Sequence, residues 1–259
     1  MKHVVMFSGG ICSWAAGKRI AERHGTADMV LLFADTLIEH WDTYRFLEEG
    51  AANIGAPLVR IADGRTPFDV FRDERFIGNS RADPCSKILK RRLLDRWLAE
   101  NCEPENTTLV FGIHWSEMDR FERVSARLAP WKCVAPMCEP PFVAVDDMHA
   151  WAESEGIRKQ WLYTIGMPHA NCGGGCVKMG QGGWARAYHA NREVFDRWEA
   201  EESRLRELLG DVAMLKDRRG GSARPLPLNE LRQRIESNQQ VDMYDQGGCG
   251  CFSGAEEAA

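Results

Sequence analysis

The fold is decided by residues 3–13, which read HVVMFSGGICS. The apolar run His3–Phe7 has the composition of a short buried strand, and Gly9-Gly10 interrupts it. The residues from Ile11 to His24 then predict a helix, because their apolar members recur at helical spacing. A strand, a glycine turn and a helix in this order are the beginning of a βαβ unit.

The same alternation continues to residue 113. Three further strands are predicted at Met29–Phe33, Pro57–Ile61 and Thr107–Ile113, and two further helices at Trp41–Ile54 and Ser86–Leu98. Strands that alternate with helices form right-handed crossovers and a parallel sheet. The predicted fold class is therefore α/β, with a mostly parallel, Rossmann-like sheet flanked by helices. Such sheets bind ligands at the carboxyl ends of their strands.

The pattern changes in the second half of the chain. A glycine-rich segment occupies residues 171–183, and one long charged helix is predicted over Trp184–Leu209. We expect residues 1–180 to form the α/β domain, including the cysteine- and glycine-rich segment. We expect residues 181–259 to form a helical C-terminal extension with a cysteine-containing tail.

Composition excludes several classes of protein. The 259 residues are 44% hydrophobic and 27% charged, which is typical of a globular chain and excludes disorder as the dominant state. The net charge of −5 argues against wholesale electrostatic binding to nucleic acid or to an anionic membrane. No apolar run reaches the roughly 18 residues of a membrane span, and no signal peptide fits the N-terminus. We therefore expect a cytoplasmic protein without membrane contact.

The glycine turn predicts a phosphate site. Gly9 and Gly10 let the backbone approach a ligand closely, and the following helix offers unpaired N–H groups. Ser8 and Ser13 add hydroxyl groups. The loop therefore predicts binding of a pyrophosphate or sulfate group, and the alternative is an ordinary tight turn. Valine at Gly9 is expected to block the phosphate and to leave the fold intact.

The loop also resembles a known family. The sequence FSGGICS at residues 7–13 is similar to the pyrophosphate loop of the adenine nucleotide α-hydrolase-like superfamily, which includes ATP pyrophosphatases and phosphoadenosine phosphosulfate (PAPS) reductases. Three further segments resemble motifs of that family in the same order: Asp35-Thr36 with Glu39, CSKILK at 85–90, and GIHWSE at 112–117 with Arg120 and Arg123. The resemblance covers residues 3 to about 180. The chain departs from the family where Ile11-Cys12 replaces Lys-Asp and where His114 replaces Arg.

This resemblance implies the members of a nucleotide site. The residues expected to bind ATP are Ser8, Gly9, Gly10, Ser13, Asp35, Thr36, Lys87, Lys90, Gly112, Glu117, Arg120 and Arg123. Those expected to take part in catalysis are Ser13, Asp35 and Lys87, with Cys249 as a thiol carrier.

Each of these side chains also has a simpler explanation. Asp35 ends a strand and would receive the adenine or ribose donors or hold Mg²⁺, and the alternative is that it caps a helix or turn. Lys87 and Lys90 would neutralise phosphate oxygens, or would belong to a solvated basic face, and the second explanation is stronger for Lys90. Arg120 and Arg123 would clamp phosphate or sulfate, or would pair with acidic residues on a helix surface. His114 and His169 are expected to be structural.

Nine cysteines suggest metal or thiol chemistry, because their number is odd and the expected compartment is reducing. Cys172 and Cys176 flank three glycines, which would let the backbone wrap an inorganic group. The resemblance to sulfonucleotide reductases implies that Cys85, Cys172 and Cys176 hold a 4Fe–4S cluster with one open iron. Zinc bound by four thiolates, including those of Cys249 and Cys251, is the alternative. A third possibility makes one of the two tail cysteines a mobile nucleophile.

Three functions remain open at this stage. The first is a PAPS reductase-like ATP pyrophosphatase that adenylates an acceptor, releases pyrophosphate and supports sulfur transfer. Its acceptor would be a base in tRNA or DNA or a small molecule, and a protein would supply sulfur or reducing equivalents. The second is a sulfonucleotide reductase. The third is a non-catalytic nucleotide-binding subunit with a structural metal. The sequence leaves the oligomeric state open, and each of the three functions allows an oligomer.

Overall fold

The central sheet consists of five parallel strands in the order β3-β2-β1-β4-β5. Its strands are β1 (Lys2–Met6), β2 (Met29–Asp35), β3 (Leu58–Ala62), β4 (Thr107–Phe111) and β5 (Lys132–Val134). The computed structural model describes residues 1–219 and 221–247. Four of the strands lie where the sequence predicts them, and β5 is an addition. The expected α/β class with a parallel, Rossmann-like sheet is confirmed.

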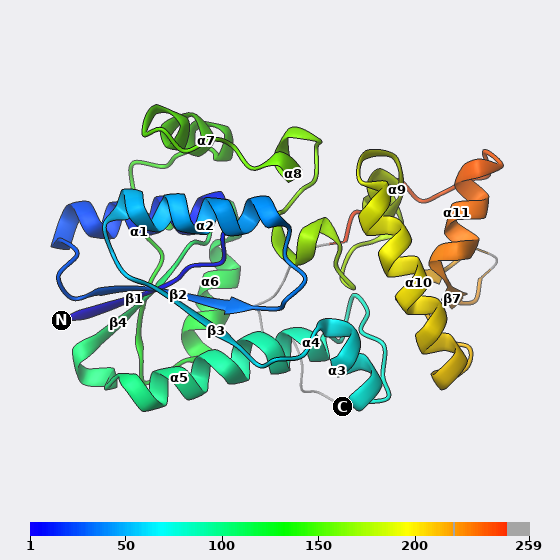
Figure 1. The fold of residues 1–259 in the computed structure, drawn as a ribbon, viewed down its shortest axis with the longest axis horizontal. Helices are drawn as coiled ribbons and strands as arrows, with labels where there is room; N and C mark the ends of the chain where they lie inside the picture. The colour runs from blue at the N-terminus through cyan, green and yellow to red at the C-terminus, as the bar shows by residue number, and fades with distance from the viewer. Residues whose placement is uncertain (220, 248–259) are drawn as a thin grey trace.

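Helices cover both faces of this sheet (Figure 1). One layer contains α1 (Ile11–His24), α2 (Trp41–Ile54) and α7 (Val145–Ser154), and the other contains α5 (Leu93–Asn101) and α6 (Met118–Arg127). Successive residues of a strand point to opposite faces. Val5 therefore packs under α1, whereas the neighbouring Val4 packs against α5. Burial on both faces explains the continuous apolar runs of the strands.

The helix predicted at 86–98 is longer and less regular than expected. It runs without a break through α4 (Pro84–Ser86), the π-helical segment η1 (Lys87–Arg92) and α5. A π-helical turn contains more residues than an α-helical turn, so it rotates the side chains that follow it. Both lysines expected at the nucleotide site, Lys87 and Lys90, lie within this segment.

The C-terminal part corrects one prediction. The single helix expected over Trp184–Leu209 is two helices, α9 (Gln181–Ala190) and α10 (Arg192–Leu209), separated at Asn191. The break lets the two helices fold against each other, and Trp184 meets the ring of Trp198 at 5.5 Å between centroids. The sequence spacing gave no sign of it, because asparagine is tolerated within a helix and tertiary packing makes the choice.

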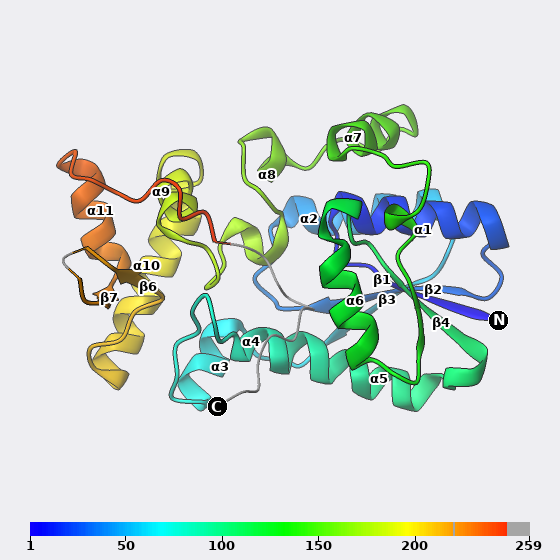
Figure 2. The same cartoon turned by 180° about the vertical axis from the view of Figure 1, so that it is seen from behind.

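Further elements complete the chain. They are α3 (Pro67–Asp73), α8 (Trp161–Thr164), α11 (Leu228–Glu236), the hairpin of β6 (Leu215–Asp217) and β7 (Arg224–Leu226), and the short turns η2 (Pro104–Asn106), η3 (Trp115–Glu117), η4 (Pro136–Cys138) and η5 (Asn171–Gly174). Figures 1 and 2 show α9, α10 and α11 at the end of the molecule toward which the strands run. One hydrophobic cluster joins Phe68 and Phe71 of α3 to Leu231 of α11. The expected boundary at residue 180 stays a prediction, and it crosses this shared core.

No helix in the part of the chain that the structure describes is long and apolar enough to span a bilayer.

Candidate nucleotide site

The site lies where the strand order reverses. β1 and β4 are neighbours in the sheet, although the chain passes through β2 and β3 between them. The loops after β1 and β4 touch at Gly112, where a Cβ would lie 2.4 Å from both Cα and N of Ser13. Only glycine fits this contact. Such a reversal opens a crevice at the carboxyl edge of a parallel sheet, which is the usual ligand position.

The glycine turn itself has the expected geometry. Gly9 has φ 77°, and Gly10 is the N-cap of α1. The N–H groups of Gly10, Ile11 and Cys12 have no backbone carbonyl partner among residues 1–219 and 221–247. One expectation is wrong: a Cβ at Gly9 would lie 2.9 Å from Cγ2 of Thr43, in a backbone conformation that disfavours side chains. Valine at this position would disturb the fold as well as the ligand.

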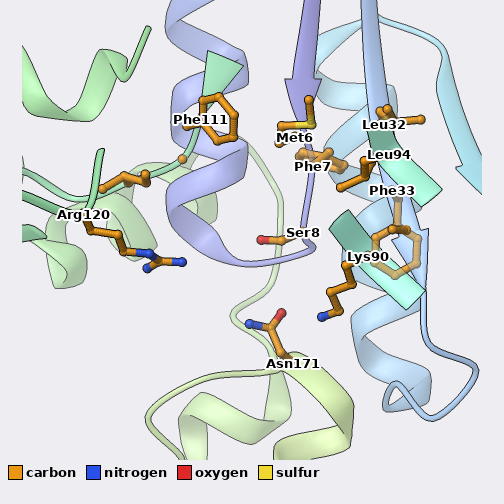
Figure 3. A pocket seen from close by; sticks show the side chains of 13 residues that line it. Met6, Phe7, Ser8, Leu32, Phe33, Lys90, Leu94, Phe111, Arg120 and Asn171 are labelled. Carbon is orange, nitrogen blue, oxygen red and sulfur yellow. The ribbon is translucent and has the colours of Figure 1, made fainter. Parts of the chain in front are cut away.

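Two cavities meet at this turn. The wider one has a volume of ≈ 370 Å³ and is lined by residues that include Ser8, Ser13, His114 and Glu117. The narrower one, of ≈ 60 Å³, is mainly apolar and lies among side chains of the sheet and of α5 (Figure 3). Both are lined by Ser8, Gly112, Arg120 and Asn171. The wider cavity is within the usual size range of ligand pockets, about 300–1,000 Å³.

Arg120 is the main cation of the wider cavity. Figure 3 shows its side chain extending from α6 toward Ser8. Its Nη1 donates to Oε1 of Glu117 at 3.0 Å, while its buried Nε has no hydrogen-bond partner in the described structure. A buried donor without an acceptor costs about 1–3 kcal/mol. An oxyanion of a ligand at Ser8 would remove that cost.

The structure reverses the expected order of the two lysines. Lys90 is 7% exposed, lines the narrow cavity and extends toward Asn171 in Figure 3. Lys87 lines neither cavity. Burial raises the pKa of Glu39, and the ammonium group of Lys90 opposes that rise. Of the two lysines, Lys90 is the one that lines a cavity beside the glycine turn.

The carboxylate of Asp35 is hydrogen-bonded to other groups of the protein and does not face either cavity. Its Oδ1 accepts from the N–H of Leu37 at 2.8 Å and from the hydroxyl of Tyr44 at 2.9 Å. Its Oδ2 accepts from Nε of Arg60 at 2.6 Å, and the residue lines neither cavity. Burial and this carboxylate together raise the pKa of Tyr44. These contacts match the alternative in which Asp35 caps a turn.

Magnesium would require another carboxylate. Glu117 is the one acidic residue among the described residues that line the wider cavity. Protein-bound Mg²⁺ with ATP commonly uses one or two carboxylates together with phosphate oxygens. Glu117 fits that arrangement, and the buried Thr36 does not, because its hydroxyl donates to Oε1 of Glu39 at 2.9 Å.

The remaining expected residues divide between the cavity and the surface. Ser13 lines the wider cavity, and its hydroxyl donates to the carbonyl of Gly10 at 2.7 Å. Nε2 of His114 lies 3.1 Å from the carbonyl of Val143, and its Nδ1 lies 2.7 Å from Oγ of Ser116, which fits the structural role expected for it. Arg123 is exposed and lines neither cavity, so its expected role as a phosphate clamp has no support in the geometry.

The cysteines expected to bind a metal share one hydrophobic cluster. Cys172 and Cys176 are buried in it, and Cys85 packs against it. In the described ranges no three His, Cys, Asp or Glu side chains converge closely enough to hold a metal ion. Cys249 and Cys251 lie outside those ranges. The iron–sulfur cluster and the zinc site both stay predictions.

The glycines between Cys172 and Cys176 have a packing role. A Cβ at Gly173 would lie 2.8 Å from the carbonyl of Ile38, and one at Gly175 would lie 2.3 Å from Nε1 of Trp198. Protein atoms, rather than an open space, occupy the positions of the missing side chains. The glycine run therefore does not by itself indicate an inorganic group.

Sequence reasoning missed two residues of the site. Asn171 lines both cavities, and only its place before Cys172 singled it out. Cys12 lines the wider cavity, and burial raises the pKa of its thiol to about 11, so it is protonated at neutral pH. No family model matches the chain, and no curated protein matches it, so the geometry alone carries the assignment of this site.

Proposed function

We propose that the protein is an ATP pyrophosphatase of the PAPS reductase-like kind, within the adenine nucleotide α-hydrolase-like superfamily. The triphosphate would lie in the wider cavity over the turn at Gly10. The adenine would enter the crevice at the apolar residues Phe33 and Phe111, which line the narrow cavity. Adenylation of an acceptor, followed by sulfur transfer, is the proposed reaction.

The observation that carries this proposal concerns residues 1–219 and 221–247: within them, Nε of Arg120 has no hydrogen-bond partner, and it lies beside a turn whose N–H groups have no backbone partner. Two sets of donors from different elements, α6 and the start of α1, line the same cavity. Lys90 adds a second cation in the neighbouring narrow cavity. Donors that converge on one space favour an anionic ligand with several oxygens, such as a polyphosphate.

The arrangement suits attack at the α-phosphorus. An acceptor oxygen would form a bond to that phosphorus, and the bond to the bridging oxygen of pyrophosphate would break. Arg120, Lys90 and the N–H groups of the turn would stabilise the charge that the leaving pyrophosphate gains. Glu117 would hold Mg²⁺ bound to the phosphates. A sulfur nucleophile from the donor would then displace AMP and replace the acceptor oxygen.

Calorimetric titration with Mg·ATP tests the site. Arg120→Gln removes the guanidinium, and we expect ATP affinity to fall about 30-fold, the equivalent of about 2 kcal/mol for a charged hydrogen bond. Arg123→Gln is the matched control, since Arg123 lies one turn away on the same helix and is exposed. Equal affinities in the two variants would remove Arg120 from the site.

Product analysis tests the reaction. With its acceptor present, the wild-type protein should release pyrophosphate and AMP in equal amounts. Release of sulfite from a sulfonucleotide, without cleavage of ATP, would assign the protein to the reductases instead. ATP binding without either product, across acceptors that include RNA, DNA and small thiol acceptors, would leave only the non-catalytic subunit.

A further inference from the structure

A second polar cavity lies in the C-terminal part of the molecule. It has a volume of ≈ 520 Å³, and it is formed by the end of the hairpin strand β6 and by residues 240–245. A smaller neighbouring cavity shares Lys216, Arg218 and Asp245 with it and is also lined by Arg81. The two cavities therefore bring the turn at residues 79–82 next to the C-terminal extension.

The cations of this surface are available for a ligand. Arg81, Lys216 and Arg218 are exposed, and none of them forms an ion pair within residues 1–219 and 221–247. The nearest acid along the chain, Asp217, is already paired with Arg219, Arg224 and Arg234. The hydrogen bonds from Arg219 and Arg234 lower the pKa of Asp217. Its charge is thus neutralised by other arginines.

The acids in the second cavity also have local partners. Oδ1 of Asp242 accepts from the N–H groups of Tyr244 and Asp245 at 3.1 and 3.2 Å. Oδ2 of Asp245 accepts from the N–H of Gln181 at 3.2 Å. Both carboxylates thereby hold the backbone of the segment in place, and the three unpaired cations remain the groups suited to contact phosphate.

An exposed aromatic ring stands beside these cations. Tyr244 is 98% exposed and Met243 is 52% exposed, and both line the second cavity. A tyrosine ring is seldom so fully accessible without a partner, because burial of its apolar body is favourable. Flat rings next to cations are the usual means of binding single-stranded nucleic acid, since bases stack on the ring while the cations contact phosphates.

The same segment connects the two sites. Residues 243–245 line the second cavity, while Gln246 and Gly247 line the wider nucleotide cavity. The segment is held against the start of α9, because Gly182 N–H donates to Asp245 at 2.8 Å and Gly180 N–H donates to Gln246 at 3.2 Å. Figure 2 shows it in red, passing from α11 beside α9 toward the sheet. A nucleic-acid strand bound at Tyr244 would thus have a path to the nucleotide cavity.

We infer that Arg81, Lys216, Arg218 and Tyr244 form a binding surface for single-stranded nucleic acid. The three cations contact the phosphates, and the tyrosine ring stacks with a base. The inference rests on the proposed function only for the role of this strand, which supplies the acceptor base to the nucleotide cavity. Unpaired strands fit better than a duplex, because a base must leave its pair to stack on Tyr244.

The test is fluorescence anisotropy with the full chain, without ATP, and with labelled single-stranded RNA and DNA of mixed sequence. Tyr244→Ala should weaken binding about tenfold, while Tyr244→Phe, which keeps the ring, should not change it. Arg218→Glu should weaken binding. It should also reduce the slope of log affinity against log salt concentration by the amount expected for about one phosphate contact. Arg96→Glu is the matched control, as an exposed arginine with the same charge change on α5.

Each outcome decides the inference. Loss of binding with Arg96→Glu and not with Arg218→Glu would overturn it and move the contact to α5. Equal binding of polyglutamate, or equal binding by Tyr244→Ala and wild type, would also overturn it. Oligonucleotide binding without pyrophosphate release would sustain the surface and contradict the proposed reaction. Pyrophosphate release with a small acceptor and no oligonucleotide binding would support the proposed reaction and overturn the binding surface.

Discussion

Two glycine-rich segments of this chain look similar in sequence and do opposite things in the structure. Gly10 is the N-cap of α1 and faces a cavity, and a Cβ there would meet nothing closer than 3.6 Å. Gly175 lies in the core, and a Cβ there would lie 2.3 Å from the indole of Trp198. Glycine thus exposes backbone donors in one place and permits close packing in the other.

The comparison shows what a run of glycines can indicate. The first turn predicts a ligand because a helix begins directly after it, so its N–H groups have no internal partners. The second run is followed by a large helical part of the chain that must pack on it. A glycine segment indicates an anion site only where the following backbone leaves its donors unused.

Metal analysis is the strongest test of this difference between the two glycine segments. The sequence predicts that protein purified without oxygen is brown and contains iron and acid-labile sulfide, and that Cys172→Ser abolishes the colour completely. Cys102→Ser, on a half-buried cysteine packed in a different hydrophobic cluster, should leave it unchanged. In that case the second glycine segment would both pack and enclose an inorganic group.

Other results would assign the cysteines differently. Colourless protein with one zinc, lost when the tail after residue 247 is removed, would support the four-thiolate site. Cys249→Ser separates the roles of the tail: loss of metal makes Cys249 a ligand, and loss of turnover with the metal retained makes it a thiol carrier.

Substitution of single glycines should give the next largest effect. Gly175→Ala places a methyl group against Trp198, and we expect the free energy of unfolding to fall by about 3 kcal/mol, since the buried indole has little room to move. Gly10→Ala should cost less than about 1 kcal/mol and should weaken ATP binding instead. Urea unfolding of both variants measures the difference. Similar losses of stability would show that the two segments are not distinct.

A smaller effect is expected in the pH dependence of stability, and it concerns only the part of the molecule that packs around Gly175. Glu202, on α10 one turn after Trp198, accepts from the N–H groups of Met214 and Leu228, and burial raises its pKa to about 7. The folded protein therefore binds this proton more tightly than the unfolded chain, whose carboxyl has a pKa of 4.5. Its contribution to stability is complete below pH 4.5 and is lost as the pH rises through about 7, by about 3 kcal/mol.

Unfolding in urea at several pH values checks this sign. Glu202→Gln should flatten the dependence between pH 4.5 and 7 relative to wild type, although it lowers stability at every pH because its NH₂ opposes one of the two backbone donors. A variant with the same slope as wild type would assign the pH dependence to another group. We expect the stability of the turn at Gly10 to show no such pH dependence, either in wild type or in Glu202→Gln.

The parallel sheet and its order of elements were predictable because each strand and helix has a clear period or an uninterrupted apolar run. The predicted helices at 11–24 and 41–54 have the observed bounds. The break at Asn191 was not predictable, since it depends on how Trp184 and Trp198 meet across two helices. The same holds for the lysines expected at the site, because the burial of Lys90 in the narrow cavity depends on the elements packed around its helix.

By itself the sequence determined the α/β class, the glycine turn at the end of β1 and the set of charged residues from which a phosphate site could be built. Local periodicity and the conformational freedom of glycine are properties of short segments, so the chain alone carries them. Only the tertiary structure decided that Lys90 and Arg120 face the cavity, that Asp35 caps a turn, and that Gly175 lies beneath Trp198. These choices depend on contacts between residues far apart in the chain, where burial and close packing outweigh the preference of any single segment.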